Sequence, residues 1–108
     1  MSTQASPERR TSTRVRTDVP VIAHQNGVAQ RLRAVDLSCG GALLQRRSQR
    51  QPPMLQRVEL LLRGRRTVRG VARTVWARGG LHAVRFVEFS DADRLEIAEH
   101  VDLLYRNR

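Results

Sequence analysis

The pattern of apolar residues divides the chain into two unequal parts, and this division constrains the fold more than any other feature. Up to Phe89 the apolar residues come in short runs rich in β-branched side chains, which is typical of β-strands. After Ser90 they recur at Ile97, Val101 and Leu104, the spacing of an amphipathic helix. We therefore expect a chain built mainly of strands that ends in one helix, at about residues 91–106.

Six strand-like runs are recognisable before the helix. The predicted strands are Val19–Ala23, Val28–Leu37, Gly41–Leu44, Val58–Leu62, Thr67–Trp76 and His82–Phe89. Turn signals rich in Gly, Asn or Ser separate most of them, and Pro52-Pro53 marks a longer loop. Short strands followed by a single helix predict a small antiparallel barrel or sandwich with the helix at one end.

The helix has a recognisable start, and the few aromatic residues have expected places. Ser90 followed by Asp91 and Asp93 is typical of a capped helix N-terminus with carboxylates at the positive end of the helix dipole. Aromatic residues make up only 4% of the chain, so the core is expected to be thin. All four are expected to pack in the core or against the helix: Trp76, Phe86, Phe89 and Tyr105.

The charge of the chain is strongly positive and unevenly distributed. All 20 basic residues are arginines, against 10 acidic residues, which gives a net charge of +10. Residues 1–87 hold 17 arginines and four acids, whereas residues 88–108 hold three arginines and six acids. A body this basic attracts anions such as nucleotides, nucleic acid, anionic lipid or an acidic protein face. The absence of lysine excludes a phosphate-binding Walker lysine, a Schiff-base lysine and a serine–lysine dyad.

Several function classes find no support in the residues. The length of 108 residues fits one domain, and Cys39, the only cysteine, excludes an intrachain disulfide. The three histidines, His24, His82 and His100, lie far apart, so we expect no metal site. No nucleophile and base stand in a recognisable arrangement, so we expect no enzyme. No apolar run is long enough to span a membrane and no leader-like segment is seen, which predicts a cytoplasmic protein.

The most informative local feature is a predicted hairpin. Asn26-Gly27 between two strand-like runs is typical of a two-residue type I′ turn. Pairing about that turn places opposite each other residues whose numbers add to about 53, so Arg16 should face Leu37 and Arg14 should face Cys39. The two arginines Arg10 and Arg14 are then expected beside the turn at residues 36–41.

The groups brought together by this hairpin suit a guanine nucleotide. Arginine can donate two parallel hydrogen bonds to guanine O6 and N7 or to phosphate oxygens, and the Asp36 carboxylate can accept from the guanine N1–H and amino groups. Ser38 can donate to or accept from a base edge, and Gly41 allows a close approach that a Cβ would forbid. The alternative is that Asp36 and Ser38 cap a turn and Arg14 simply pairs with Asp36.

Two short motifs in this region resemble the PilZ domain family of bacterial receptors for cyclic di-GMP. The first is RxxxR at Arg10–Arg14, and the second, one hairpin later, is DxSxxG at Asp36–Gly41. The resemblance implies a six-stranded antiparallel PilZ-type β-barrel with a C-terminal helix and no enzymatic activity of its own. Residues 1–13 are polar and have no apolar period, so we expect them to form a flexible N-terminal arm before a single barrel domain, residues 14–108.

The resemblance also implies a ligand, cyclic di-GMP, and a role for each motif residue. Arg10 and Arg14 would hold the guanine faces and phosphates, and Asp36 and Ser38 would read a guanine edge. The remaining members of the predicted ligand-binding set are Gly40, Gly41, which would shape the turn, and Arg9, which would go with a stacked pair of ligand molecules. Ligand binding would order the arm over the barrel and signal to an unidentified effector protein, in processes such as motility or biofilm regulation.

Two other functions stay open at this point. One is non-specific nucleic-acid binding by the arginine-rich segments 46–50 and 63–66, against which the scarcity of aromatic residues for base stacking argues. The other is a PilZ-like adaptor that binds only protein, against which the intact motifs argue, because a pure adaptor needs no such set of residues.

Overall fold

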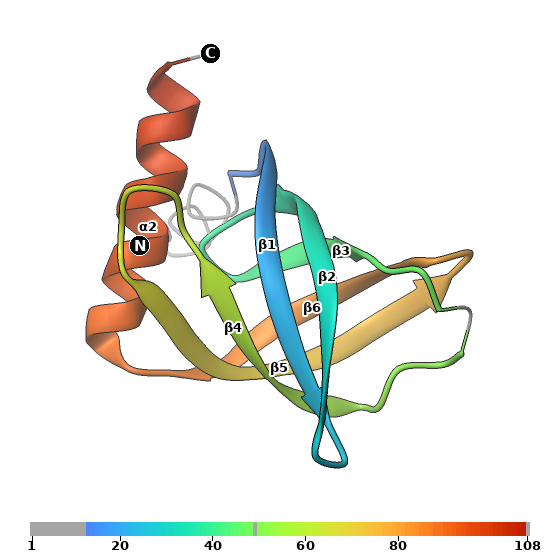
Figure 1. Ribbon diagram of the computed structural model, residues 1–108. Helices are drawn as coiled ribbons and strands as arrows, with labels where there is room; N and C mark the ends of the chain where they lie inside the picture. Colours follow the sequence, from blue (N-terminus) through green and yellow to red (C-terminus); the bar gives the residue numbers. More distant parts are fainter. Residues whose placement is uncertain (1–12, 49, 108) are drawn as a thin grey trace, which may run out of the picture.

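The computed structural model describes residues 13–48 and 50–107, which form a β-barrel with one helix beside it (Figure 1). Within these residues the six strands are β1 (Val15–Gln25), β2 (Val28–Leu37), β3 (Gly41–Gln45), β4 (Leu55–Leu61), β5 (Thr67–Arg78) and β6 (Leu81–Phe89), and helix α2 (Asp91–Arg106) follows. All strand pairs are antiparallel, and the sheet closes in the order β1-β2-β3-β6-β5-β4. The predicted mainly β fold with a C-terminal helix is confirmed, and the choice between barrel and sandwich is settled in favour of the barrel.

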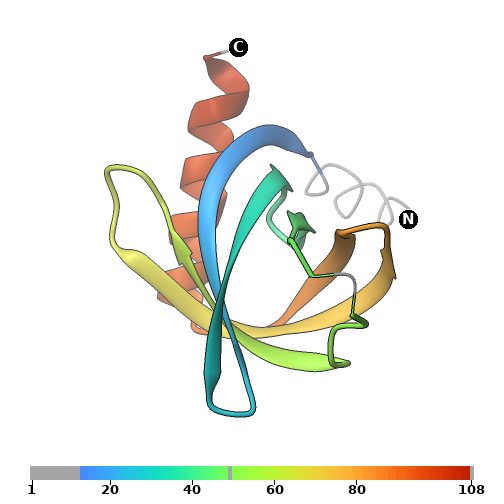
Figure 2. The same cartoon turned by 45° about the vertical axis from the view of Figure 1, so that its right-hand side comes forward.

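Closure of the barrel depends on the pairing of β1 with β4. Residues Val21–His24 of β1 pair with Arg57–Leu60 of β4, so β1 has partners on both sides. In Figure 2 the long β1–β2 hairpin curves over one side of the barrel, and β5 and β6 cross the other. The closure covers only part of β1, because residues 15–20 have no partner on β4.

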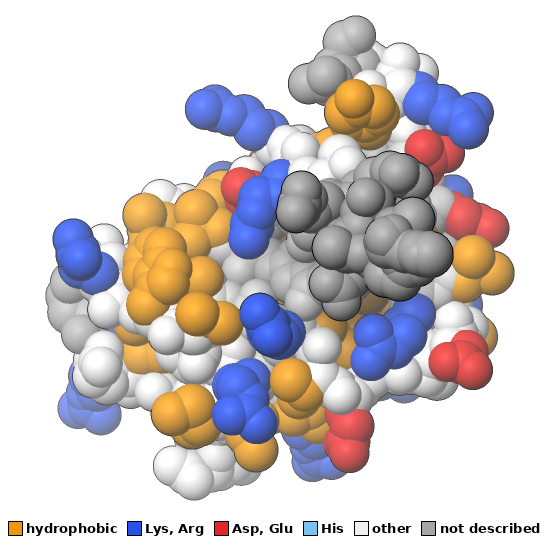
Figure 3. Space-filling model, turned by 180° about the vertical axis from the view of Figure 1, so that it is seen from behind, with side chains coloured by type: hydrophobic (Ala, Val, Ile, Leu, Met, Phe, Trp, Pro, Cys, Tyr) orange, Lys and Arg blue, Asp and Glu red, His pale blue; other side chains and the backbone are white. Residues whose placement is uncertain are grey.

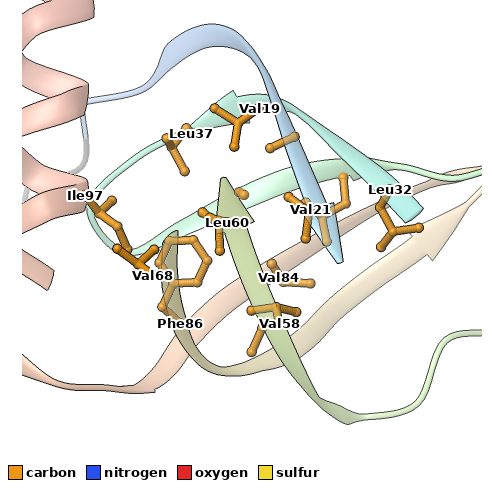
Figure 4. Packing of buried hydrophobic residues seen from close by; sticks show 14 of the residues in the cluster. Val19, Val21, Leu32, Leu37, Val58, Leu60, Val68, Val84, Phe86 and Ile97 are labelled. Carbon is orange, nitrogen blue, oxygen red and sulfur yellow. The ribbon is translucent and has the colours of Figure 1, made fainter. Parts of the chain in front are cut away.

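The core is formed by the inward-facing residues of all six strands. Alternate positions on β1 are buried, among them Val19 and Val21, as alternation of side chains along a half-buried strand requires. Ile97 and Val101 of α2 are buried against one end of this cluster, where Ile97 points toward Val68 and Phe86 (Figure 4). Burial of this apolar stripe is what holds the helix on the barrel.

The expected places of the aromatic residues are only half right. Phe86 is buried, and Phe89 packs against it with ring centroids 4.9 Å apart. Trp76 and Tyr105, which we expected in the core or against the helix, are 48% and 46% exposed. Trp76 faces outward because a β-bulge between Thr74 and Trp76 changes the alternation of β5.

The β1–β2 hairpin has the predicted turn and, over most of its length, the predicted register. Asn26 and Gly27 both have positive φ, 51° and 79°, as a type I′ turn requires. The pairs from Gln25 and Val28 back to Val19 and Ala34 follow the predicted register. A bulge between Arg16 and Val19 then shifts it by one residue, because the bulged strand carries an extra residue.

This bulge corrects two predicted neighbours. Arg16 pairs with Asp36 and not with Leu37, which is opposite Val15 instead. Arg14 precedes β1, and its guanidinium contacts Asp36 and not the predicted neighbour, Cys39.

Helix α2 begins at the predicted cap and is tied to the loop between β4 and β5. Ser90 Oγ accepts a hydrogen bond from the backbone N–H of Asp93 at 3.1 Å. The arginines of the β4–β5 loop reach the acidic side of the helix: Arg65 Nη1 lies 3.1 Å from both Glu96 and Glu99, and Arg66 Nη1 lies 2.7 Å from Asp93. No helix within the described residues is long and apolar enough to cross a membrane.

Candidate functional site

The predicted binding residues that the structure describes meet at the end of β2 and the turn that follows it. Arg14, Asp36, Ser38, Gly40 and Gly41 lie within the described residues. Arg9 and Arg10 lie outside them, as does nearly all of the predicted arm, residues 1–13. The described part of the predicted site therefore consists of these five residues.

Arg14 and Asp36 form an ion pair whose geometry leaves the carboxylate available. Arg14 Nη1 lies 3.4 Å from Asp36 Oδ1, and the Arg14 side chain is 55% exposed. Asp36 Oδ1 is itself buried and accepts no hydrogen bond from any described residue. The 3.4 Å approach is thus an attraction between charges without an aligned hydrogen bond. A buried carboxylate oxygen in this state can still accept a hydrogen bond from another donor.

Ser38 shapes the turn. Its side chain is buried, and its Oγ accepts hydrogen bonds from the backbone N–H groups of Gly40 and Gly41 at 3.3 and 3.2 Å. The hydroxyl also donates to the Gly41 carbonyl oxygen at 3.3 Å. The alternative in which Ser38 caps a turn and Arg14 pairs with Asp36 describes the geometry of this structure well.

Gly41 is needed for strand packing, whereas Gly40 faces open space. A Cβ on Gly41 would lie 2.2 Å from the backbone oxygen of Val84 on β6, closer than real Cβ contacts allow. A Cβ on Gly40 would meet nothing within 4 Å. The close approach that we expected at Gly41 is therefore made by the backbone of β6 and not by a ligand. The open space in this turn lies beside Gly40.

Cys39 does not have the surroundings of a reactive thiol. It is a half-buried free cysteine in the same turn. Burial, with a smaller effect of the Asp102 carboxylate, raises the pKa of the thiol. The thiolate is the nucleophilic form, so this environment makes Cys39 less reactive at neutral pH.

The site continues as a row of outward-facing residues across four strands. Asp36 on β2 is in register with Leu43 on β3, Leu43 with Ala83 on β6, and Ala83 with Trp76 on β5. Residues in cross-strand register share a face of the sheet. Three strand spacings separate Asp36 from Trp76, a backbone distance of about 14 Å. We call this row of four residues the platform.

Two arginines border the platform on the next row. Arg85 on β6 pairs with Gly41 on one side and Arg73 on β5 on the other, and both arginines are exposed. Figure 3 shows apolar side chains gathered over the ends of β5 and β6, with basic side chains beside them. Neither arginine has an ion pair with a described residue.

Trp76, Arg73 and Arg85 are the residues that sequence reasoning missed. The alternation of β5 gives no sign of the bulge at Thr74–Trp76, and a lone tryptophan in a strand is more often a core residue. The placement of Trp76 on the row of Asp36 follows from the pairing of β2, β3, β6 and β5, which cannot be read from local pattern.

The arrangement combines a closed barrel with a basic outer face, a carboxylate oxygen without a hydrogen-bond donor among the described residues, and an exposed indole. The family model for the PilZ domain matches residues 8–103 of the chain, which therefore belongs to the PilZ domain family. Members of this family are receptor and adaptor domains related to cyclic di-GMP signalling and are generally not enzymes. None of the curated protein sequences matches this chain.

Solved structures of low sequence identity share the fold. The inhibitor of motility MotI/DgrA of Bacillus subtilis is 14% identical with a TM-score of 0.82, and the match covers 93% of this chain and 53% of that one. An uncharacterized Legionella protein, Lpg0364, is 12% identical with a TM-score of 0.64, covering 89% and 97%. The PilZ domain of CeSA from a cellulose-synthesizing bacterium is 18% identical with a TM-score of 0.62, covering 89% and 98%. The chain thus spans about half the length of MotI/DgrA.

Proposed function

We propose that this chain is a receptor for cyclic di-GMP and that the ligand lies along the platform. The observation that carries the proposal is the buried Asp36 Oδ1, which accepts no hydrogen bond from a described residue and stands beside the exposed Arg14. A carboxylate in this state suits the N1–H and amino groups of guanine, which are donors on one edge of a planar base. Membership of the PilZ domain family supports the choice of the cyclic dinucleotide among guanine ligands.

The far end of the platform offers a place for the second base. Trp76 presents about half of its surface to solvent on the row that begins at Asp36. Stacking of a base on an aromatic side chain is worth about 1–3 kcal/mol. Leu43 and Ala83 form an apolar floor between the two ends, and Arg73 and Arg85 are placed to attract the phosphates.

The proposal includes the arm and a partner. Arg9 and Arg10 would close on the bound ligand from outside the described residues, and Arg14 would turn from Asp36 to the ligand. Two negative phosphates would offset the mutual repulsion of these arginines, which favours the closed arm only when ligand is present. Arg9 would support a stacked pair of ligand molecules, and the ordered arm would present a new surface to an unidentified effector protein.

Non-specific nucleic-acid binding is less well supported, because some of the arginines expected to contact nucleic acid are paired with carboxylates of the same chain. Arg65 and Arg66 are engaged by carboxylates of α2, so segment 63–66 offers fewer free cations than its sequence indicates. The second alternative is an adaptor that binds protein and no nucleotide. Titration with cyclic di-GMP distinguishes it from a receptor.

The test is isothermal titration with cyclic di-GMP, GTP and a short DNA duplex. We expect saturable binding of the cyclic dinucleotide alone, at least about 30-fold weaker in Arg14→Ala because a charge-assisted contact is lost. Trp76→Ala should weaken it roughly 10-fold through lost stacking. The matched control is Arg57→Ala, which removes an exposed arginine of β4 away from the platform. Trp76 is the only tryptophan, so binding should also change its fluorescence.

Each contrary result has a distinct meaning. Equal losses in Arg14→Ala and Arg57→Ala would show that only net charge matters. Binding of the duplex without binding of the cyclic dinucleotide would favour the nucleic-acid alternative, and no binding of any of the three ligands would leave the adaptor. The measured stoichiometry decides between one ligand molecule and a stacked pair.

A further inference from the structure

A second basic region lies over β1 and β2, next to the β2 end of the platform. It is an open hollow of about 1780 Å³ over the outer faces of β1 and β2, bounded by the end of β3, the β4–β5 loop and the C-terminal half of α2. Figure 1 shows β1 and β2 in front and β5 and β6 behind them, and in the closed strand order β2 is opposite β5. The platform extends away from the hollow across β3, β6 and β5, and the two regions meet only at the paired residues Arg16 and Asp36.

The rim of the hollow carries more positive charge than its own residues neutralise. Six arginines line it: Arg16, Arg31, Arg33, Arg46, Arg47 and Arg63. Of the described lining residues only Asp18 is acidic, and its Oδ1 pairs with Arg33 Nε at 3.0 Å. Among the described residues, the other five arginines have no carboxylate partner, and Arg46 Nε is buried without a hydrogen bond. Five such guanidinium groups around one hollow attract an anionic partner.

The floor of the hollow is apolar. Pro20 and Ile22 of β1 line it, together with Leu61 of β4 and Leu104 of α2, and Leu61 is 39% exposed. None of the described lining residues is Phe, Trp or Tyr. Single-stranded nucleic acid is usually held by aromatic stacking within a basic groove, so this lining favours aliphatic side chains as the occupant of the floor.

The barrel restricts the form that an occupant can take. The part of β1 without a partner on β4, residues 15–20, is a poor template for an added peptide strand. It is bulged between Arg16 and Val19, and Pro20 has no N–H to donate. A polyproline helix needs an aromatic-lined groove, which this hollow is not. An amphipathic α-helix places an apolar stripe on the floor and carboxylates against the rim, and the volume accommodates roughly three to four turns of a helix about 10 Å wide.

The chain itself does not supply such a helix. The apolar stripe of α2, with Ile97 and Val101, is buried on its own barrel, and Asp93 and Glu96 are paired with its own arginines. Segment 1–12 contains one acidic residue, Glu8, against two arginines, so it cannot neutralise the rim. The outer face of α2 does expose Leu95 and Leu103 beside carboxylates. A second copy, however, carries a net charge of +10, which opposes its approach to the basic rim.

We propose that the hollow is a docking groove for an acidic amphipathic helix of a partner protein. The proposal goes beyond the receptor function and does not depend on it, since the residues that carry it are Arg31, Arg47 and Arg63 on the rim and Ile22 and Leu61 on the floor. It gives a role to arginines of the segments 46–50 and 63–66 that the platform leaves unused.

The test uses a defined probe in place of the unidentified partner. The probe is a fluorescent peptide of about 18 residues with Leu at helical i, i+3, i+4 and i+7 spacing and Glu elsewhere, compared with a scrambled peptide of the same composition. Binding is followed by fluorescence anisotropy at about 150 mM salt without cyclic di-GMP, so the result stands whether or not the receptor function holds. We expect micromolar binding of the amphipathic peptide, at least about tenfold tighter than the scrambled one.

Variants of the rim and the floor locate the binding. Arg31→Glu/Arg63→Glu should weaken peptide binding at least about 30-fold, and Leu61→Ser about fivefold. The matched control, Arg57→Glu/Arg78→Glu, changes two arginines that do not line the hollow and should change binding less than about threefold. Equal affinity for the scrambled peptide, an equal loss in the control pair, or no binding would each overturn the proposal. So would a single-stranded oligonucleotide that binds at the same rim arginines more tightly than the peptide.

Discussion

Gly40 and Gly41 are neighbours in the turn after β2, yet their surroundings differ. A Cβ on Gly41 would press into the backbone of β6, which cannot turn aside as a flexible side chain can. We expect Gly41→Ala to lower the free energy of unfolding by about 2 kcal/mol, the cost of overpacking a tight site. Gly40→Ala, the matched control, should change it by less than about 0.5 kcal/mol. Urea unfolding followed by circular dichroism measures both, and equal stability of the two variants would contradict the packing argument.

At the same scale, the motif residues could be found from the sequence but their roles could not be separated. The spacing of Asp36, Ser38 and Gly41 predicted a turn, and the structure contains it. Whether Ser38 shapes that turn or faces outward depends on the direction of one hydroxyl. That direction is set by backbone groups of the next strand, which local sequence does not reveal.

Besides its buried apolar stripe, helix α2 has a polar tie to the barrel in its first turn, the side chain of Asp93. Asp93 is buried, pairs with Arg66 at 2.7 Å and accepts a hydrogen bond from the backbone N–H of Arg69 at 3.3 Å. We expect Asp93→Ala to lower the free energy of unfolding by about 2 kcal/mol, because one hydrogen bond and one charge contact are lost together. Asp91→Ala is the control on the same turn. It removes an exposed carboxylate that only complements the helix dipole, and it should cost less than about 1 kcal/mol.

Thermal unfolding of the two variants distinguishes a specific tie from a general effect of charge at the helix start. Equal shifts in Asp93→Ala and Asp91→Ala would mean that the dipole alone accounts for the effect. A larger shift in Asp93→Ala would support a specific contact between α2 and the β4–β5 loop, because of these two carboxylates only Asp93 pairs with an arginine of that loop.

At the scale of elements, periodicity predicted the helix and the first hairpin, and two β-bulges explain the errors in strand register and side-chain direction. The spacing of Ile97, Val101 and Leu104 predicted the helix, and the Asn26-Gly27 turn fixed the register of most of the first hairpin. Each of the two consequential errors lies beside a bulge, one between Arg16 and Val19 and one between Thr74 and Trp76. A bulge adds a residue without changing the composition of a strand, so alternation read from the sequence loses its phase there.

At the scale of the whole molecule, closure is the property that local sequence left open. Six strands and a helix are compatible with a barrel or a sandwich until β4 is paired with β1. That pairing brings together residues about 35 positions apart, such as Ile22 and Glu59, and puts His24 Nε2 3.2 Å from Glu59 Oε2. The platform and the hollow, which carry the two proposals, are neighbouring regions on the outside of this barrel.

Closure also buries a histidine, and this gives the folded state a dependence on pH. His82 on β6 points inward, is 1% exposed and lies with Nε2 3.4 Å from Gln56 Nε2. Burial, with a smaller effect of the Arg46 charge, lowers its pKa to about 4 from the usual 6.5. Burial and the charge of Arg65 also lower the pKa of His100.

Protonation of these histidines therefore favours the unfolded chain, because only there is the pKa near 6.5. The stability contributed by neutral His82 is complete above pH 6.5 and is lost as the pH falls from there toward 4, by on the order of 3 kcal/mol. Urea unfolding at a series of pH values between 7 and 4.5 measures the loss, and the narrow range limits the contribution of carboxylates. His82→Gln should flatten most of the slope, with the remainder due to His100. A slope that stays unchanged in His82→Gln would mean that burial of His82 does not set the acid sensitivity of the barrel.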